Sequence, residues 1–168
     1  LQRQTKQSES RHKRMKRLVF FLGVALMLSS CADDFVYESN MPIEGGVWDS
    51  KQAANFEFDI QDTVSLHDFF IDIRNGEQYQ FSNLFVFIEM EFPNGKLSVD
   101  TLECPMADPQ GNWFGRSGLG DLYDNRIIYK SRKQFPLSGH YKVSIHQAMR
   151  VNPVEGIYDI GFRLAKSK

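Results

Sequence analysis

The residue types that most often perform catalysis are present, but their spacing matches no catalytic pattern. Three histidines, His67, His140 and His146, lie beyond residue 31. None of them has a Cys, Asp or Glu at the spacing typical of a zinc site. No serine occupies a Gly-x-Ser-x-Gly turn, and the sequence contains no glycine-rich nucleotide-binding motif. We therefore expect no enzymatic activity, no metal and no cofactor.

The acidic pair Glu89 and Glu91 is the remaining candidate for acid–base chemistry. In a strand, residues two positions apart share one face. A glycosidase needs two carboxylates on opposite sides of a cleft, and nothing in the sequence ties this pair to a cleft. We therefore interpret the pair as part of a solvated strand face.

Cys31 ends a segment that is typical of an export signal. Basic residues after Met15 are followed by eleven apolar residues, 18–28, whereas a membrane-spanning helix needs about 20. Leu28-Ser-Ser-Cys31 resembles the bacterial lipobox. The resemblance implies diacylglycerol transfer to the Cys31 sulfur, cleavage before Cys31, and acylation of the new amino terminus, for example with palmitate. The alternative is a buried apolar helix that ends in a chance cysteine.

These features predict the domain organisation. Residues 1–30 form a signal peptide with an over-long start before Met15. Residues 31–50 form the lipidated N-terminus and a tether, and residues 51–168 form a single domain. Two acidic residues, Asp33 and Asp34, directly follow the lipidated cysteine, as in export signals of Bacteroidetes surface lipoproteins, although a plain solvated tether explains them equally well.

Charge is distributed unevenly along the chain. The whole sequence has a formal charge of -1, from 20 basic and 21 acidic residues. Seven of the basic residues and one acidic residue precede Cys31, so the remainder holds 13 basic and 20 acidic residues and carries -7. A domain of this charge is not a typical nucleic-acid partner, and its membrane affinity must come from acyl chains. Cys104, the only other cysteine, is expected to be a buried small side chain.

Apolar residues beyond the tether alternate with period two, which is typical of strands with one buried face. The run 84–92 is apolar on both faces and predicts a central strand covered on both sides, joined to the next strand by a turn at 93–96. Residues 104–124 are expected to be loop. The pattern predicts an all-β fold, an antiparallel β-sandwich of the jelly-roll or immunoglobulin-like type, with strands at 56–60, 69–73, 84–92, 97–103, 141–145 and 157–164.

Within the expected loop 104–124, residues 107–121 combine four glycines with Trp113, Phe114 and Arg116. Tryptophan and arginine dominate interface hot spots, so the loop is a candidate interaction site for a partner or a glycan. The alternative is that Trp113 closes one end of the sandwich and the glycines only turn corners.

Seven segments follow one another along the chain: 36–38, 79–88, 100–103, 107–121, 135–141, 147–150 and 156–161. Together with the lipobox, these segments resemble the gliding motility lipoprotein GldH family of Bacteroidetes. The resemblance implies an accessory outer-membrane lipoprotein of the gliding machinery, linked to type IX secretion, with envelope proteins as partners and no catalytic residues. A surface carbohydrate-binding sandwich lipoprotein is the alternative.

Overall fold

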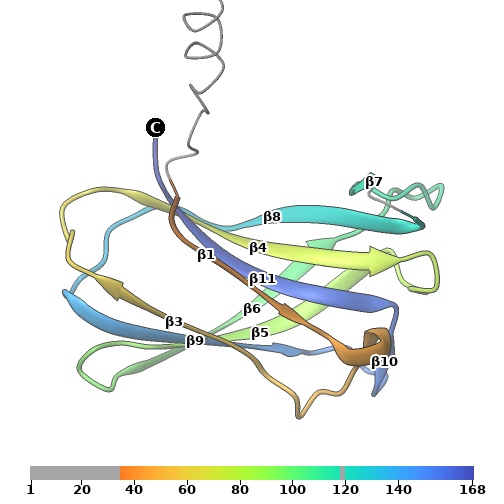
Figure 1. The fold of residues 1–168 in the computed structure, drawn as a ribbon, viewed down its shortest axis with the longest axis horizontal. Helices are drawn as coiled ribbons and strands as arrows, with labels where there is room; N and C mark the ends of the chain where they lie inside the picture. Colours follow the sequence, from red (N-terminus) through yellow and green to blue (C-terminus); the bar gives the residue numbers. More distant parts are fainter. Residues whose placement is uncertain (1–34, 118–119) are drawn as a thin grey trace, which may run out of the picture. The chain divides into compact units, whose positions relative to one another are not determined.

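Eight antiparallel strands of seven or more residues form most of the structure, a computed structural model that describes residues 35–117 and 120–168 (Figure 1). The expected signal peptide and Cys31 lie outside the described residues. The long strands are β1 (Phe35–Pro42), β3 (Ala54–Ile60), β4 (His67–Gly76), β5 (Asn83–Glu91), β6 (Leu97–Pro105), β8 (Leu122–Lys133), β9 (Gly139–Gln147) and β11 (Ile157–Lys166). The short elements are η1 (Glu44–Gly46), β2 (Val47–Trp48), β7 (Arg116–Ser117) and β10 (Val154–Glu155).

The strands form two main sheets, and the strand order identifies the sandwich type. One sheet has the order β1-β11-β4-β8-β7 and the other has the order β3-β9-β5-β6, while β10 and β2 form a separate pair. If the eight long strands alone are renumbered 1 to 8 in chain order, the strand order is 1-8-3-6 in the first sheet and 2-7-4-5 in the second. This is the order of an eight-stranded jelly roll with two Greek keys. In an immunoglobulin fold the first strand pairs with the second. The predicted antiparallel sandwich is confirmed, and of its two variants the topology is that of the jelly roll.

The core lies between the two sheets and follows the predicted alternation. Phe56, Phe58 and Ile60 of β3 are buried, while the residues between them are exposed. The Phe58 ring lies 5.8 Å from that of Tyr141 in the same sheet and 5.7 Å from that of Phe162 in the opposite sheet. Burying each of these aromatic rings contributes about 1.5–3 kcal/mol, so this contact between the layers is a main source of stability.

The strand predicted over 84–92 is present, but the prediction that both of its faces are covered is wrong. It lies between β9 and β6, and it forms the predicted hairpin with β6. Leu84, Val86 and Ile88 are buried, whereas Phe87 on the other face is 47% exposed. A phenylalanine at an outward position made the run look apolar on both sides.

The sandwich begins earlier than the sequence suggests. Residues 35–42, placed in the tether, form β1 and pair with β11 along its length. The strand was missed because Ser39, Asn40 and Pro42 interrupt any apolar alternation. Strand β8 was also missed, because charged residues such as Asp124 and Arg126 conceal its period. The predicted loop 104–124 accordingly contains β7 and the start of β8.

Within residues 35–117 and 120–168, the chain forms no helix with the length and apolar composition of a membrane span.

Candidate functional site

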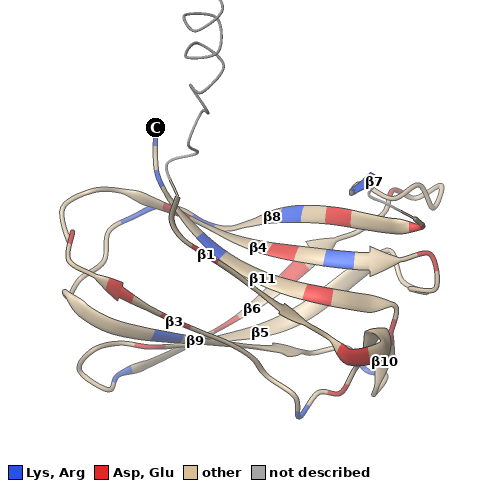
Figure 2. Cartoon of the chain, viewed as in Figure 1, with Lys and Arg blue, Asp and Glu red and all other residues tan. Residues whose placement is uncertain are grey.

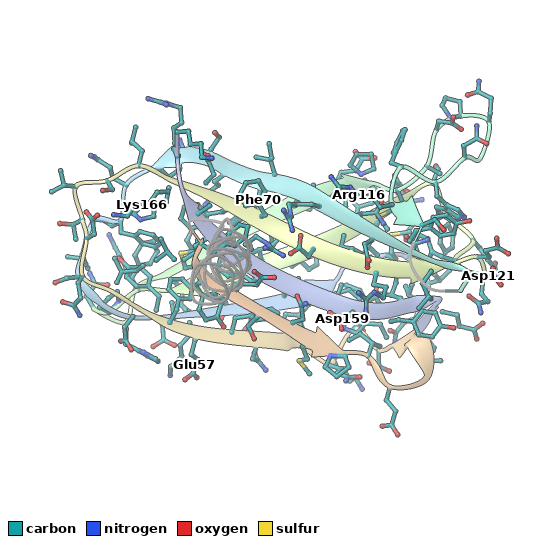
Figure 3. The ribbon with its side chains drawn as sticks, turned by 45° about the horizontal axis from the view of Figure 1, so that its top comes forward. Glu57, Phe70, Arg116, Asp121, Asp159 and Lys166 are labelled. Atoms are coloured by element: carbon teal, nitrogen blue, oxygen red, sulfur yellow. The ribbon has the colours of Figure 1, made fainter. Side chains whose placement is uncertain are left out.

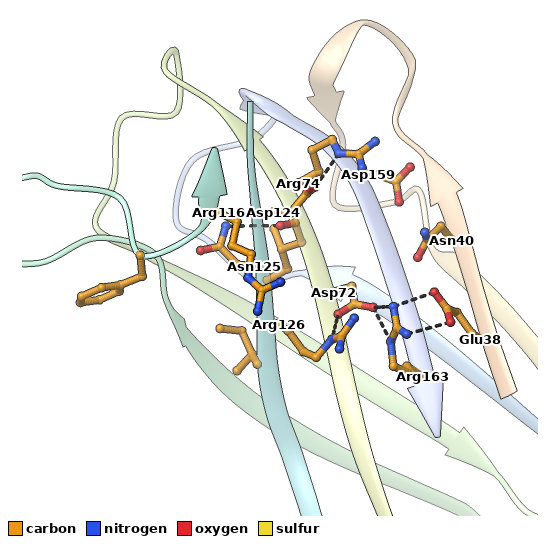
Figure 4. A pocket seen from close by; sticks show the side chains of 13 residues that line it. Glu38, Asn40, Asp72, Arg74, Arg116, Asp124, Asn125, Arg126, Asp159 and Arg163 are labelled. Atoms are coloured by element: carbon orange, nitrogen blue, oxygen red, sulfur yellow. Dashed lines mark hydrogen bonds and ion pairs between the residues drawn. The ribbon is translucent and has the colours of Figure 1, made fainter. Parts of the chain in front are cut away.

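The outer face of the five-stranded sheet carries a pocket with a volume of about 600 Å³, shown in Figure 4. Strands β1, β11, β4, β8 and β7 all contribute side chains to it. Figure 2 shows acidic and basic segments next to each other on β4 and β8. The lining residues are Glu38, Asn40, Asp72, Ile73, Arg74, Phe114, Arg116, Asp124, Asn125, Arg126, Ile127, Asp159 and Arg163.

All basic residues of this pocket are arginines. Four of the six arginines beyond residue 30 line it, and none of the seven lysines does. The guanidinium group is planar and presents its donors in a fork that matches carboxylates and phosphates, whereas a lysine ammonium is a point charge. The pocket is therefore built for directional contacts with oxygen acceptors.

Strand register aligns one row of charges across the sheet. Asp159 of β11 lies opposite Arg74 of β4, and Arg74 lies opposite Asp124 of β8. Asp124 in turn lies opposite Arg116 of β7. The signs alternate along the row, which favours cross-strand pairing. Arg74 Nε donates to Asp124 Oδ1 over 2.6 Å.

A second group of charges is centred on Arg163 of β11, whose side chain is only 8% exposed. Its Nε donates to Asp72 Oδ2 over 2.9 Å, and its Nη1 donates to Glu38 Oε2 over 2.7 Å. Arg126 Nε donates to the other oxygen of Asp72 over 3.0 Å. Because Arg163 is nearly buried, both carboxylates are needed to satisfy its donors.

The ring of Phe35 contacts two arginines of this group. The register of β1 against β11 shifts between Phe35 and Tyr37, and such a bulge re-aims a side chain. The guanidinium carbon of Arg163 lies 4.3 Å from the centroid of the Phe35 ring, and that of Arg126 lies 5.8 Å from it. Cation–π attraction to the ring adds to the ion pairs below it.

Gly161 of β11 lies between two side chains that line the pocket, Asn40 and Asp72. It lies opposite Asn40 on one side and Asp72 on the other. A Cβ at this position would overlap Asn40 Oδ1 and stand 3.0 Å from Asp72 Cβ. Only glycine leaves room here for the side chains that approach from both neighbouring strands.

The electrostatic environment differs along the row. Burial raises the pKa of Asp159, and the like charges of Asp124 and Asp72 act in the same direction, while Arg74 opposes them. The hydrogen bond to Asp124 raises the pKa of Arg74. Arg74 is thus stabilised as a cation, whereas burial disfavours the charged form of Asp159.

Of the three loop residues singled out from the sequence, two line the pocket and one packs against the core. Phe114 is 60% exposed and lines the pocket together with Arg116. Trp113 is half-buried, and its ring centroid lies 6.2 Å from that of Tyr79 and 5.8 Å from that of Tyr123. Trp113 therefore packs against the core at the end of the sandwich, and only Phe114 and Arg116 face the pocket. Figure 3 shows Arg116 and Asp159 on the same side of the sandwich.

A tight turn holds the loop in place. Asp108 Oδ1 accepts the backbone N–H groups of Gln110 and Asn112, over 2.9 and 2.8 Å. The side-chain hydrogen bond from Asn112, together with these backbone contacts, lowers the pKa of Asp108. Gly111 has a φ of +86°, which a glycine adopts without strain.

The other candidates from the sequence lie away from this pocket. Glu89 and Glu91 point outward from β5 in the four-stranded sheet, as expected for a solvated strand face. His67 is buried, while His140 lies on the surface of β9 within 3.3 Å of Glu57 and 3.2 Å of Asp59. The described residues include no group of three potential metal-ligating side chains. Cys104 is buried as expected, and burial raises the pKa of its thiol to about 12.

Most residues of the pocket were not identified as site residues from the sequence. Asp72 and Arg74 in β4, and Asp124 and Arg126 in β8, are pairs of opposite charge at positions i and i+2. This spacing places both members on one strand face, and that signal was available. What the sequence could not supply is the register that brings β4 and β8 together.

The described residues thus define a jelly-roll sandwich whose outer face carries a pocket of paired charges. The family model for the GldH lipoprotein matches residues 35–164, and the chain belongs to this family. It is 42% identical over 154 residues to a gliding motility lipoprotein GldH homolog of Christiangramia forsetii, covering 88% of this chain and 93% of that protein. It is 34% identical over 158 residues to the gliding motility lipoprotein GldH of Flavobacterium johnsoniae, covering 90% and 97%.

Similarity to solved structures is weaker. A 4-O-methyl-alpha-glucuronidase of glycoside hydrolase family 115 aligns with a TM-score of 0.43 and 12% sequence identity. The alignment covers 82% of this chain and 18% of that one. This likeness carries no argument about function.

Proposed function

We propose that the protein is a non-enzymatic outer-membrane lipoprotein, anchored through Cys31, that assists the gliding motility machinery linked to type IX secretion by protein contact. The observation that carries the proposal is family membership: the family match spans residues 35–164, from the first to the last long strand. Two relatives named as gliding motility lipoproteins align over nearly their full lengths. This supports the same role as a motility lipoprotein for this chain.

The pocket supports contact rather than catalysis. The carboxylates of Glu38, Asp72 and Asp124 each already accept hydrogen bonds from an arginine. Such charge-assisted hydrogen bonds fix these carboxylates in position and engage their oxygen atoms. The arrangement is suited to recognition of a charged partner.

The anchor is tested by cell fractionation of Cys31→Ala. The wild type is expected in the membrane pellet and at the density of the outer membrane, and the variant in the soluble fraction. Cys104→Ala is the matched control, because it removes the other cysteine and leaves the proposed anchor intact. If C31A stayed in the membrane pellet, the anchor assignment would be wrong.

The cellular role is tested by complementation. The chain is expressed in a Flavobacterium johnsoniae strain that lacks its own GldH, and colony spreading and secretion are recorded. Restoration is expected for the wild type and loss for C31A. Failure of the well-expressed, membrane-located wild type to restore either phenotype would contradict the proposal.

The carbohydrate-binding alternative has one observation in its favour, the exposed ring of Phe114 at the pocket. The second aromatic side chain of the loop, Trp113, is half-buried against Tyr79 and Tyr123 and does not line the pocket. A glycan array probed with the full-length protein tests this function, and a blank array would remove it.

A further inference from the structure

The row of alternating charges ends on both sides in a side chain that is free to bind a ligand. Arg74 and Asp124, in the middle of the row, bind each other at 2.6 Å. Across residues 35–117 and 120–168, neither the Asp159 carboxylate at one end nor the Arg116 guanidinium at the other makes a hydrogen bond or an ion pair. The inner pair neutralises itself, and one charge of each sign remains for a ligand.

The strand order sets the distance between these two charges. Asp159 and Arg116 stand on β11 and β7, and three strand-to-strand intervals separate them. Neighbouring strands lie about 4.8 Å apart, so the two backbone positions are separated by about 14 Å. An extended peptide rises about 3.4 Å per residue. Four residues of such a peptide span the same distance.

The surroundings of the row fit a peptide. The cavity of about 600 Å³ combines directional arginine donors with the exposed ring of Phe114 beside Arg116. A ligand that matches both ends must carry a cation for Asp159 and an anion for Arg116. Amino-acid side chains supply both groups on one backbone, whereas an acidic polysaccharide supplies only the anion.

We propose that this pocket binds an extended peptide segment of a partner protein, with an Asp or Glu carboxylate at Arg116 and a Lys or Arg about four residues away at Asp159. The inference rests on the proposed function, since the partner would belong to the motility machinery. It adds the chemistry by which that partner is recognised.

The test is selection of random peptides displayed on phage against the full-length protein purified in detergent. The expected consensus contains an acidic and a basic residue separated by about four positions. A synthetic peptide with this consensus then serves as the probe in direct titrations. Peptides in which either charge is replaced by Gln, or in which the two charges are adjacent, serve as comparisons and are expected to bind more weakly.

Two variants assign the ends of the peptide. Arg116→Gln is expected to lose the preference for the acidic residue and to keep the preference for the basic one. Asp159→Asn is expected to show the reverse. Each variant should weaken binding of the synthetic peptide by about tenfold, the effect of one lost charge-assisted hydrogen bond. Arg150→Gln and Glu89→Gln, which remove exposed charges outside the pocket, are the matched controls and should leave binding unchanged.

Three outcomes would overturn the inference: a consensus without the charge pair, the same consensus for R116Q and D159N as for the wild type, or binding of a charged oligosaccharide that R116Q abolishes while no peptide binds. The selection uses the purified protein and does not depend on motility. A negative selection with successful complementation would therefore refute this inference alone. A positive selection with failed complementation would refute the proposed function alone.

Discussion

Arg163 and Asp72 join β11 to β4 through two contacts, Nε to Oδ2 at 2.9 Å and Nη2 to Oδ2 at 2.8 Å. Arg163 is the most buried of the pocket arginines, and Glu38 holds its remaining donors. A buried charge that loses its partners is costly, whereas an exposed ion pair contributes little. The two kinds of pair lie side by side in this pocket, which allows a direct comparison.

Glu38→Gln combined with Asp72→Asn is expected to lower the free energy of unfolding by about 3 kcal/mol, because the nearly buried Arg163 loses both of its carboxylate partners. Arg74→Met, which breaks an ion pair with side chains 45% and 50% exposed, should cost no more than about 1 kcal/mol. Urea titration followed by tryptophan fluorescence, from Trp48 and Trp113, measures both. Equal effects of the two variants would contradict the assignment of Arg163 as the buried centre.

Gly156 and Gly111 have nearly the same backbone conformation, with φ of +87° and +86°. They differ in the free space around them. A Cβ at Gly156 would stand 2.8 Å from Tyr79 Cα, whereas one at Gly111 would meet nothing within 4 Å. Gly111→Ala should therefore cost only the left-handed conformation, about 1–2 kcal/mol. Gly156→Ala should cost about 1–3 kcal/mol more from overpacking. Thermal unfolding of both variants checks the difference, and a Gly156→Ala protein as stable as Gly111→Ala would show that the contact with Tyr79 relaxes freely.

Trp113→Ala and Phe114→Ala should separate stability from binding. Trp113 packs against Tyr79 and Tyr123, so its removal is expected to cost about 2 kcal/mol of stability. Phe114 is exposed, and its removal should change stability by no more than about 0.5 kcal/mol while weakening binding at the pocket. Denaturation and titration of the consensus peptide measure the two effects. If Phe114→Ala unfolded the domain, the placement of its ring at the surface would be wrong.

The thiol of Cys104 should resist alkylation at pH 8 in the folded protein and react once urea unfolds it. Burial raises its pKa from 9.0 to about 12, so between these values the unfolded chain loses a proton that the folded chain keeps. Stability therefore falls as pH rises through this window. Cys104→Ala removes this contribution and should show a shallower loss of stability between pH 9 and pH 11. An identical pH dependence for the two proteins would argue against the raised pKa.

Alternation in the sequence was a reliable guide where one face of a strand is purely apolar. Phe56, Phe58 and Ile60 show this pattern, and β3 lies where it was predicted. It failed for β8, because Asp124 and Arg126 occupy its outer face and the inward Asn125 is polar although buried. Those same charges form the pocket. The strands that carry the site were the hardest to predict because the site is made of polar residues.

The position of Phe35 limits how far the sandwich can stand from a membrane. With Cys31 acylated, as proposed, four peptide steps of at most about 3.6 Å each separate the lipid attachment from the first paired residue. The chain between Cys31 and Phe35 therefore has a maximum length of about 14 Å, which is much shorter than that of the expected tether over residues 31–50. Strand β1 has 8 residues that rise about 3.4 Å each, so its far end, beside the pocket, stands no more than about 40 Å from the attachment point. A partner that enters this pocket must itself lie close to the same bilayer.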